Sequence, residues 1–201
     1  MRIGIIGGSF DPIHNGHLAI AENARASFSL AKVIFVPAYC PPHKTRPALA
    51  PYEHRLRMVE LAISSSLFFT ASAIEAKEAC PSYAGTTVEE LKQQYGFEHD
   101  YFFIIGLDAL PILTDPERSK TYPGLCSFIA TTRPGFHFES LMQHVPGAYR
   151  PYIHINEMPA ISISSSDIRD RVRAGLPIDG MVPDCVRDYI DSFRIYTACF
   201  T

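Results

Sequence analysis

The chain has 201 residues, of which 47% are hydrophobic and 19% charged, and its formal net charge is −3 at pH 7. This balance is typical of a globular domain with a real core and argues against a dedicated nucleic-acid-binding surface, which is normally basic. No apolar run approaches the roughly 20 residues that span a bilayer, and the chain opens directly on a strand pattern. We therefore expect no signal peptide, no membrane partner and a cytoplasmic location. The five scattered cysteines are typical of reduced, incidental thiols.

The first segment has the pattern of a strand, a glycine turn, a polar loop and a helix. The apolar run Ile3–Ile6 stops at Gly7 and Gly8, and the loop that follows carries His14 and His17. Helical periodicity begins at the second histidine. In α/β proteins this arrangement forms a nucleotide site, where backbone N–H groups and a helix N-terminus face an anion.

The rest of the chain alternates short strand patterns with helical ones. In chain order we expect a strand at 32–37, an exposed proline-rich loop at 38–45, a helix at 52–66, a weak strand at 67–73, a helix at 88–95, strands at 101–105, 126–132 and 152–155, a helix from 163 to 174 and a last helix after Pro183. This order predicts one doubly wound, Rossmann-like α/β domain over residues 1–201, with a parallel sheet and a helical C-terminal part.

Two of these helices carry more specific expectations. The helix at 52–66 has an apolar stripe, and we place Arg55 on its polar side with Glu53 and Arg57. Thr87 and Glu90 have the spacing of a capping box, which predicts that the next helix begins just after Thr87.

The glycine turn differs from the two commonest phosphate-binding loops. The dinucleotide fingerprint Gly-x-Gly-x-x-Gly needs a glycine where Ile6 stands, and an acidic residue after the second strand, where the chain has Val36–Ala38. The P-loop needs a Gly-Lys-Ser/Thr ending, which the chain lacks. The informative feature is instead His14-x-Gly16-His17, whose two imidazoles can donate to phosphate oxygens from one corner. A metal site made by the same histidines with Asp11 is the competing interpretation.

At this point the sequence resembles a known family. Two signatures are similar to those of the nucleotidylyltransferase superfamily: Gly7-Gly8-Ser9-Phe10-Asp11-Pro12-x-His14-x-Gly16-His17 and Ile163-Ser164-Ser165-Ser166-x-Ile168-Arg169. Three further segments narrow the resemblance to the bacterial nicotinate-nucleotide adenylyltransferases: Pro41-Pro42-His43-Lys44, Gly106-x-Asp108 and Arg133-Pro134-Gly135. The resemblance covers nearly the whole chain and implies a nucleotidylyltransferase-like fold.

The resemblance also implies a reaction and a set of site residues. ATP and nicotinate mononucleotide would give deamido-NAD and pyrophosphate, with Mg²⁺ accompanying ATP and no tightly bound cofactor. The implied catalytic residues are His14, His17 and Arg169. The implied ATP-binding residues are Gly8, Ser9, Phe10, Gly106, Asp108, Ser165, Ser166 and Arg169. The implied acceptor-binding residues are Lys44, Tyr83, Thr87 and Arg133.

The sequence departs from the family pattern in the region that binds the acceptor. The family's Ser-Tyr-Thr-x-x-Thr segment is Ser82-Tyr83-Ala84-Gly85-Thr86-Thr87 here, and the usual tryptophan is absent, with Tyr122 or Tyr83 as substitute stacking faces. Three alternatives therefore stay open: the nicotinamide form as acceptor, pantetheine phosphate as acceptor, or a non-catalytic nucleotide-binding protein. The sequence also leaves a homo-oligomer open.

Overall fold

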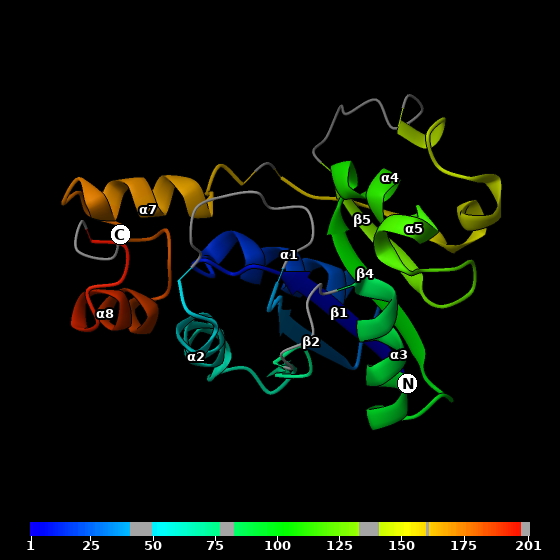
Figure 1. Cartoon of the computed structure of the whole chain (residues 1–201), viewed down its shortest axis with the longest axis horizontal. Helices are drawn as coiled ribbons and strands as arrows, with labels where there is room; N and C mark the ends of the chain where they lie inside the picture. Colours follow the sequence, from blue (N-terminus) through cyan, green and yellow to red (C-terminus); the bar gives the residue numbers. More distant parts are fainter. Residues whose placement is uncertain (41–49, 77–82, 133–140, 160, 198–201) are drawn as a thin grey trace.

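The computed structural model describes residues 1–40, 50–76, 83–132, 141–159 and 161–197, and these form a parallel sheet flanked by helices (Figure 1). Its strands are β1 (Arg2–Gly8), β2 (Lys32–Pro37), β3 (Phe69–Ala71), β4 (Asp100–Gly106), β5 (Ser127–Thr132) and β6 (Ile153–Glu157). The strand order is β3-β2-β1-β4-β5-β6, and every pairing is parallel. The predicted doubly wound, Rossmann-like α/β fold is confirmed.

The helices connect the strands and then extend beyond the sheet. They are α1 (Asn15–Ser27), α2 (Tyr52–Ile63), α3 (Ala84–Tyr95), α4 (Leu110–Leu113), α5 (Pro116–Ser119), α7 (Ser165–Arg173) and α8 (Asp184–Ser192), with 3-10 turns η1 (Leu107–Ala109) and η2 (Gly147–Tyr152). Figure 1 shows α7 and α8 together at one end of the molecule, with α8 close to α2.

Strand β1 lies at the centre of the sheet, where side chains alternate between two apolar layers. Ile6 packs into the layer that contains Ala21 of α1, Val59 of α2 and Ile190 of α8. Ile5, next to Ile6 in sequence, belongs to the opposite layer, beside helix α3. Because both faces are covered, the strands are apolar throughout rather than alternating. This central position brings the carboxyl end of β1 to the point where the strand order reverses.

Two expectations about the elements need correction, and two short helices were not predicted. Helix α3 begins at Ala84 with Tyr83 at its N-cap, so Thr87 lies inside the helix and the predicted capping box is wrong. The Thr87 hydroxyl instead donates to the Tyr83 carbonyl at 3.0 Å, one helical turn back. The second helix ends at Ile63 rather than Ser66. Finally, the short helices between β4 and β5 had no sequence prediction, because four-residue helices carry too little periodicity to detect.

Candidate functional site

The candidate site lies at the carboxyl edge of the sheet, between β1 and β4. The strand order reverses between these two neighbours, with β2 on one side and β5 on the other. Open α/β sheets bind ligands in the crevice at such a reversal. Gly8 ends β1 and Gly106 ends β4, and Asp108 follows in η1 with its side chain exposed. The fold thus brings three predicted ATP-binding residues to one edge.

Phe10 gives the loop after β1 an unusual backbone. Its φ angle is +46°, in the left-handed region that bulky residues rarely adopt, yet its side chain is almost completely buried. The ring packs against His17, with 5.1 Å between ring centroids, and against Phe35 of β2 at 5.9 Å. Local strain of this kind persists only where the surroundings fix it, and it concentrates at functional sites. Burial of the Phe10 ring holds the loop in this conformation.

The two histidines lie together at the N-terminus of α1. Their rings stack with centroids 3.6 Å apart, and the backbone N–H of His14 donates to Nδ1 of His17 at 3.2 Å. Because Nδ1 of His17 accepts this hydrogen bond, a neutral His17 carries its proton on Nε2. The pair therefore has the geometry expected of two imidazoles that serve one anion-binding corner.

His14 is buried, and this burial controls its charge. Loss of solvation lowers the pKa of His14 from 6.5 to about 4, so the imidazole is neutral near pH 7 in the free protein. Among the described residues its Nδ1 has no hydrogen-bond partner. A Cβ at Gly16 would lie 2.9 Å from this nitrogen, so only glycine leaves room for the ring. The glycine of the His-x-Gly-His motif thus allows the close approach.

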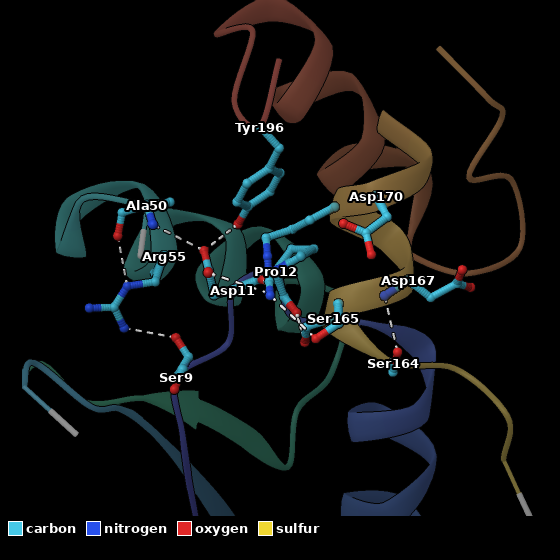
Figure 2. A network of polar contacts seen from close by, with 12 residues as sticks. Ser9, Asp11, Pro12, Ala50, Arg55, Ser164, Ser165, Asp167, Asp170 and Tyr196 are labelled. Atoms are coloured by element: carbon cyan, nitrogen blue, oxygen red, sulfur yellow. Dashed lines mark hydrogen bonds and ion pairs between the residues drawn. The ribbon is translucent and has the colours of Figure 1, made fainter. Parts of the chain in front are cut away.

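The second signature docks onto the loop of the first. Ser164 caps α7 by accepting from the backbone N–H of Asp167 at 3.1 Å, and the Ser165 hydroxyl donates to the carbonyl of Pro12 at 2.9 Å. Figure 2 shows this face of α7 against the Asp11–Pro12 segment. The predicted serines and the histidine loop, far apart in sequence, therefore meet in the structure.

Arg169 joins the two signatures directly. Its guanidinium donates to the backbone carbonyl of Asp11 at 2.6 Å and to the Ser166 hydroxyl at 3.3 Å, and it lies 3.6 Å from the Asp11 carboxylate. The side chain is 17% exposed, so it keeps access to solvent at the edge of the sheet. An arginine held in this way is suited to bind phosphate oxygens in a fixed orientation.

Arg55 contacts the site loop in a way that the sequence interpretation missed. We placed it on the solvent-facing side of α2, but only 2% of its surface is exposed. Its guanidinium donates to the backbone carbonyls of Ser9 and Ala38, both at 2.7 Å, and to that of Ala50 at 2.9 Å. Figure 2 shows the bonds to Ser9 and Ala50. Arg55 thereby ties the loop after β1 to the segment after β2.

Comparison with known proteins identifies the family. The cytidylyltransferase-like family model matches residues 5–171. A relative from Moorella thermoacetica, named probable nicotinate-nucleotide adenylyltransferase, is 43% identical and covers 97% of this chain and 91% of its own. A relative of the same name from Thermoanaerobacter sp. is 40% identical over 98% of this chain and 94% of its own. The chain belongs to the nicotinate-nucleotide adenylyltransferase family.

The fold of this chain matches that of a solved structure. The nicotinic acid mononucleotide adenylyltransferase of Plasmodium falciparum, determined with NaAD, superposes with a TM-score of 0.76 at 21% identity and covers 97% of each chain. The nucleotidylyltransferase-like architecture expected from the two signatures is therefore confirmed. No helix in the described part of the chain is long and apolar enough to cross a membrane.

The acceptor-binding residues expected from the family are only partly visible in the structure. Tyr83 is the N-cap of α3 and Thr87 lies one turn farther on, with its hydroxyl 2.5 Å from the Glu75 carboxylate, so that its one proton is shared between this carboxylate and the Tyr83 carbonyl. The ammonium of Lys120 lies 5.5 Å from the centre of the Tyr83 ring, and Tyr122 is half exposed nearby in sequence. The segments Pro41–Lys44 and Arg133–Gly135, and the single residue Ser82, fall outside the described residues.

The competing metal interpretation of the histidine loop finds no support in the geometry. Among the described residues, no three His, Cys, Asp or Glu side chains are grouped as metal ligands. Asp11, the proposed third ligand, accepts hydrogen bonds from Tyr196 and from the backbone of Ala50 instead. The Asp11 carboxylate thus faces a phenol, a backbone N–H and the Arg169 guanidinium.

Replacing Arg55 tests whether it holds the site together. We expect Arg55→Met to lower the free energy of unfolding by about 3 kcal/mol or more, because it leaves several buried carbonyls without a donor. Urea denaturation measures this loss. The matched control is Arg57→Met on the same helix, where an exposed ion pair with Glu60 should contribute less than about 0.5 kcal/mol. Equal losses in the two variants would contradict the assigned role.

The lowered pKa of His14 predicts a specific pH dependence of stability. Below pH 6.5 the unfolded chain takes up a proton at this residue, while the folded protein does not until the pH approaches about 4. Stability from His14 is therefore present above pH 6.5 and is lost as the pH falls through this window. Between pH 7 and pH 5, the wild type should lose about 1–2 kcal/mol more than His14→Asn, which keeps an N-cap residue. The free energy of unfolding is measured by denaturation at each pH. If wild type and His14→Asn lose it equally between pH 7 and pH 5, the pKa of His14 is not lowered and the prediction is wrong.

Proposed function

We propose that this chain transfers the adenylyl group of ATP to nicotinate mononucleotide, forming deamido-NAD and pyrophosphate in NAD biosynthesis. The relatives that share about 40% of its sequence over their full length carry this activity in their names. The single structural observation that supports it is that Arg169 binds the backbone of Asp11, in the same loop that leads into the stacked His14–His17 pair. The related Plasmodium structures were determined with NaAD and with the ligand named APC.

The proposed reaction is a direct displacement at phosphorus. A phosphate oxygen of the mononucleotide attacks the α-phosphorus of ATP, and the bond from that phosphorus to the bridging oxygen of the β-phosphate breaks. The electron pair leaves with pyrophosphate, and no covalent enzyme intermediate forms. Such a transfer requires in-line positioning and donors aimed at the charge that grows in the transition state.

The chain's own residues supply those donors in this proposal. His17, with its proton on Nε2, donates to the transferring phosphate, and the neutral His14 stacks behind it and shares the same corner. Arg169 holds the β- and γ-phosphates together with the N-terminal turn of α7. Gly8, Ser9 and Phe10 contact the substrates through the backbone, and Gly106 and Asp108 contact the adenosine ribose. In this proposal the acceptor is bound and selected by four other residues: Tyr83, Thr87, Lys44 and Arg133.

Magnesium enters with the nucleotide in this proposal. The described residues offer no cluster of protein ligands, so Mg²⁺ would be held by phosphate oxygens and water. Its chemistry is to neutralise charge on the leaving pyrophosphate. Because the cation travels with ATP, we expect no tightly bound metal after purification.

A panel of acceptors separates this function from its alternatives. The protein is incubated with Mg-ATP and nicotinate mononucleotide, nicotinamide mononucleotide or pantetheine phosphate, and pyrophosphate release is measured. We expect the nicotinate form to give the highest kcat/KM. A clear preference for either of the other acceptors would reassign the substrate, and no turnover with any of them would favour a binding-only protein.

Replacing His17 tests the proposed transition-state donor. His17→Ala should lower kcat by at least about a hundredfold, the scale of losing one donor to a developing charge. The control is His99→Ala, which changes a histidine next to Asp100 at the start of β4, the opposite edge of the sheet. That variant should keep kcat within about twofold of wild type. A His17→Ala enzyme of near-normal kcat would remove His17 from the catalytic role.

A further inference from the structure

Tyr196 brings the end of the chain into the corner where the two signatures meet. It lies beyond α8, and its hydroxyl donates to Oδ1 of the Asp11 carboxylate at 2.7 Å, across 185 positions of sequence. Figure 2 shows its side chain pointing from the C-terminal segment, at the top of the view, toward Asp11, which its hydroxyl meets. Neither signature contains this tyrosine, and no role was predicted for it from the sequence.

The C-terminal segment is fixed firmly enough to hold this hydroxyl in place. Ile195 and Tyr196 are both buried, in the same apolar layer as Ile168 of α7. The backbone N–H of Ile195 donates to the carbonyl of Ile190 at 3.0 Å, which anchors the segment to α8. Burial, and next the neighbouring Asp11 carboxylate, raise the pKa of Tyr196 far above its ordinary value of 10. The phenol is therefore a permanent neutral donor.

The Asp11 carboxylate stands between this phenol and Arg169. Its Oδ1 accepts from Tyr196 and from the backbone N–H of Ala50 at 3.2 Å, and its Oδ2 lies 3.6 Å from the Arg169 guanidinium. The main hydrogen bond of Arg169 to this residue goes to the backbone carbonyl instead, at 2.6 Å. Asp11 thus attracts Arg169 without forming the parallel two-bond pair that carboxylates and guanidinium groups otherwise make.

We propose that Tyr196 is a positioning residue for the triphosphate of ATP, acting through Asp11 on Arg169. Its hydroxyl, with the Ala50 N–H, occupies one carboxylate oxygen and keeps Asp11 from turning to form a two-bond pair with Arg169. The guanidinium then keeps the orientation in which it can bind phosphate oxygens. The inference rests on the proposed function in one respect, namely that Arg169 binds the β- and γ-phosphates.

The test compares two tyrosines of the C-terminal part. Tyr196→Phe removes only the hydroxyl that contacts Asp11. The matched control, Tyr189→Phe, removes the hydroxyl that lies 2.9 Å from Nδ1 of His54, outside the site. The probe is the α,β-methylene analogue of ATP, whose α–β linkage cannot be cleaved, with Mg²⁺ and calorimetry. Losing a hydrogen bond to a charged group should raise the Kd of Tyr196→Phe about tenfold, and Tyr189→Phe should stay within about twofold of wild type.

Kinetics and a double-mutant cycle distinguish positioning from a general structural effect. In steady state, Tyr196→Phe should raise KM for ATP and leave KM for nicotinate mononucleotide within about twofold, whereas a loosened fold would raise both. In an Asp11→Asn background, Tyr196→Phe should have no further effect on the Kd of the analogue, because its action passes through the carboxylate. Additive effects of the two substitutions would overturn the proposal.

The readouts also separate this inference from the function on which it rests. Weaker analogue binding by Tyr196→Phe, in a protein that turns over none of the acceptors, would sustain the inference and overturn the proposed function. If the wild-type protein turns over nicotinate mononucleotide and Tyr196→Phe binds the analogue as tightly as wild type does, the proposed function is sustained and the inference is overturned. A wild-type protein that does not bind the analogue at all would overturn both.

Discussion

Two arginine side chains that bind backbone carbonyls hold the loop after β1, and the arrangement of the site depends on them. Arg55 donates to the carbonyl of Ser9 from α2, and Arg169 donates to the carbonyl of Asp11 from α7. The C=O and N–H groups that flank a trans peptide bond point in opposite directions. Holding the Ser9 carbonyl toward Arg55 therefore directs the Phe10 N–H to the other side of the loop. In the proposed site, Phe10, a buried apolar residue, could therefore bind substrate through its backbone N–H.

In the proposed site, positive charge comes from Arg169 and from helix termini rather than from His14. Burial keeps His14 neutral near pH 7, so this imidazole would act through directional hydrogen bonds, while Arg169 carries a permanent positive charge. The first turns of α1 and α7 add partial positive charge at the same edge of the sheet. A neutral histidine avoids the cost of burying a cation before any phosphate is present. Charge and orientation are thus supplied by different residues.

The comparison of prediction with structure shows which signals a sequence carries. The strands, their parallel order and the meeting of the two signatures follow from patterns that are local or shared with a family. Arg55 was placed on the wrong side of α2 because its partners are backbone carbonyls in the connections after β1 and after β2, and hydrophobic periodicity does not register such bonds. Tyr196 escaped detection for a similar reason, because Asp11, which accepts the hydrogen bond from its hydroxyl, lies 185 positions away in sequence. Thr87 was misread because its hydroxyl bonds the preceding turn instead of capping the helix.

The topology explains why the end of the chain returns to its beginning. A doubly wound sheet places the loop after β1 at the reversal of strand order, where the sheet itself covers only one side of a ligand. After β6 the chain crosses back, and α7 and α8 pack on the layer formed by α1 and α2. This return delivers Arg169 and then Tyr196 to Asp11, a residue of the first loop. The contacts around Asp11 are therefore complete only when α7 and the segment after α8 have packed against the loop after β1.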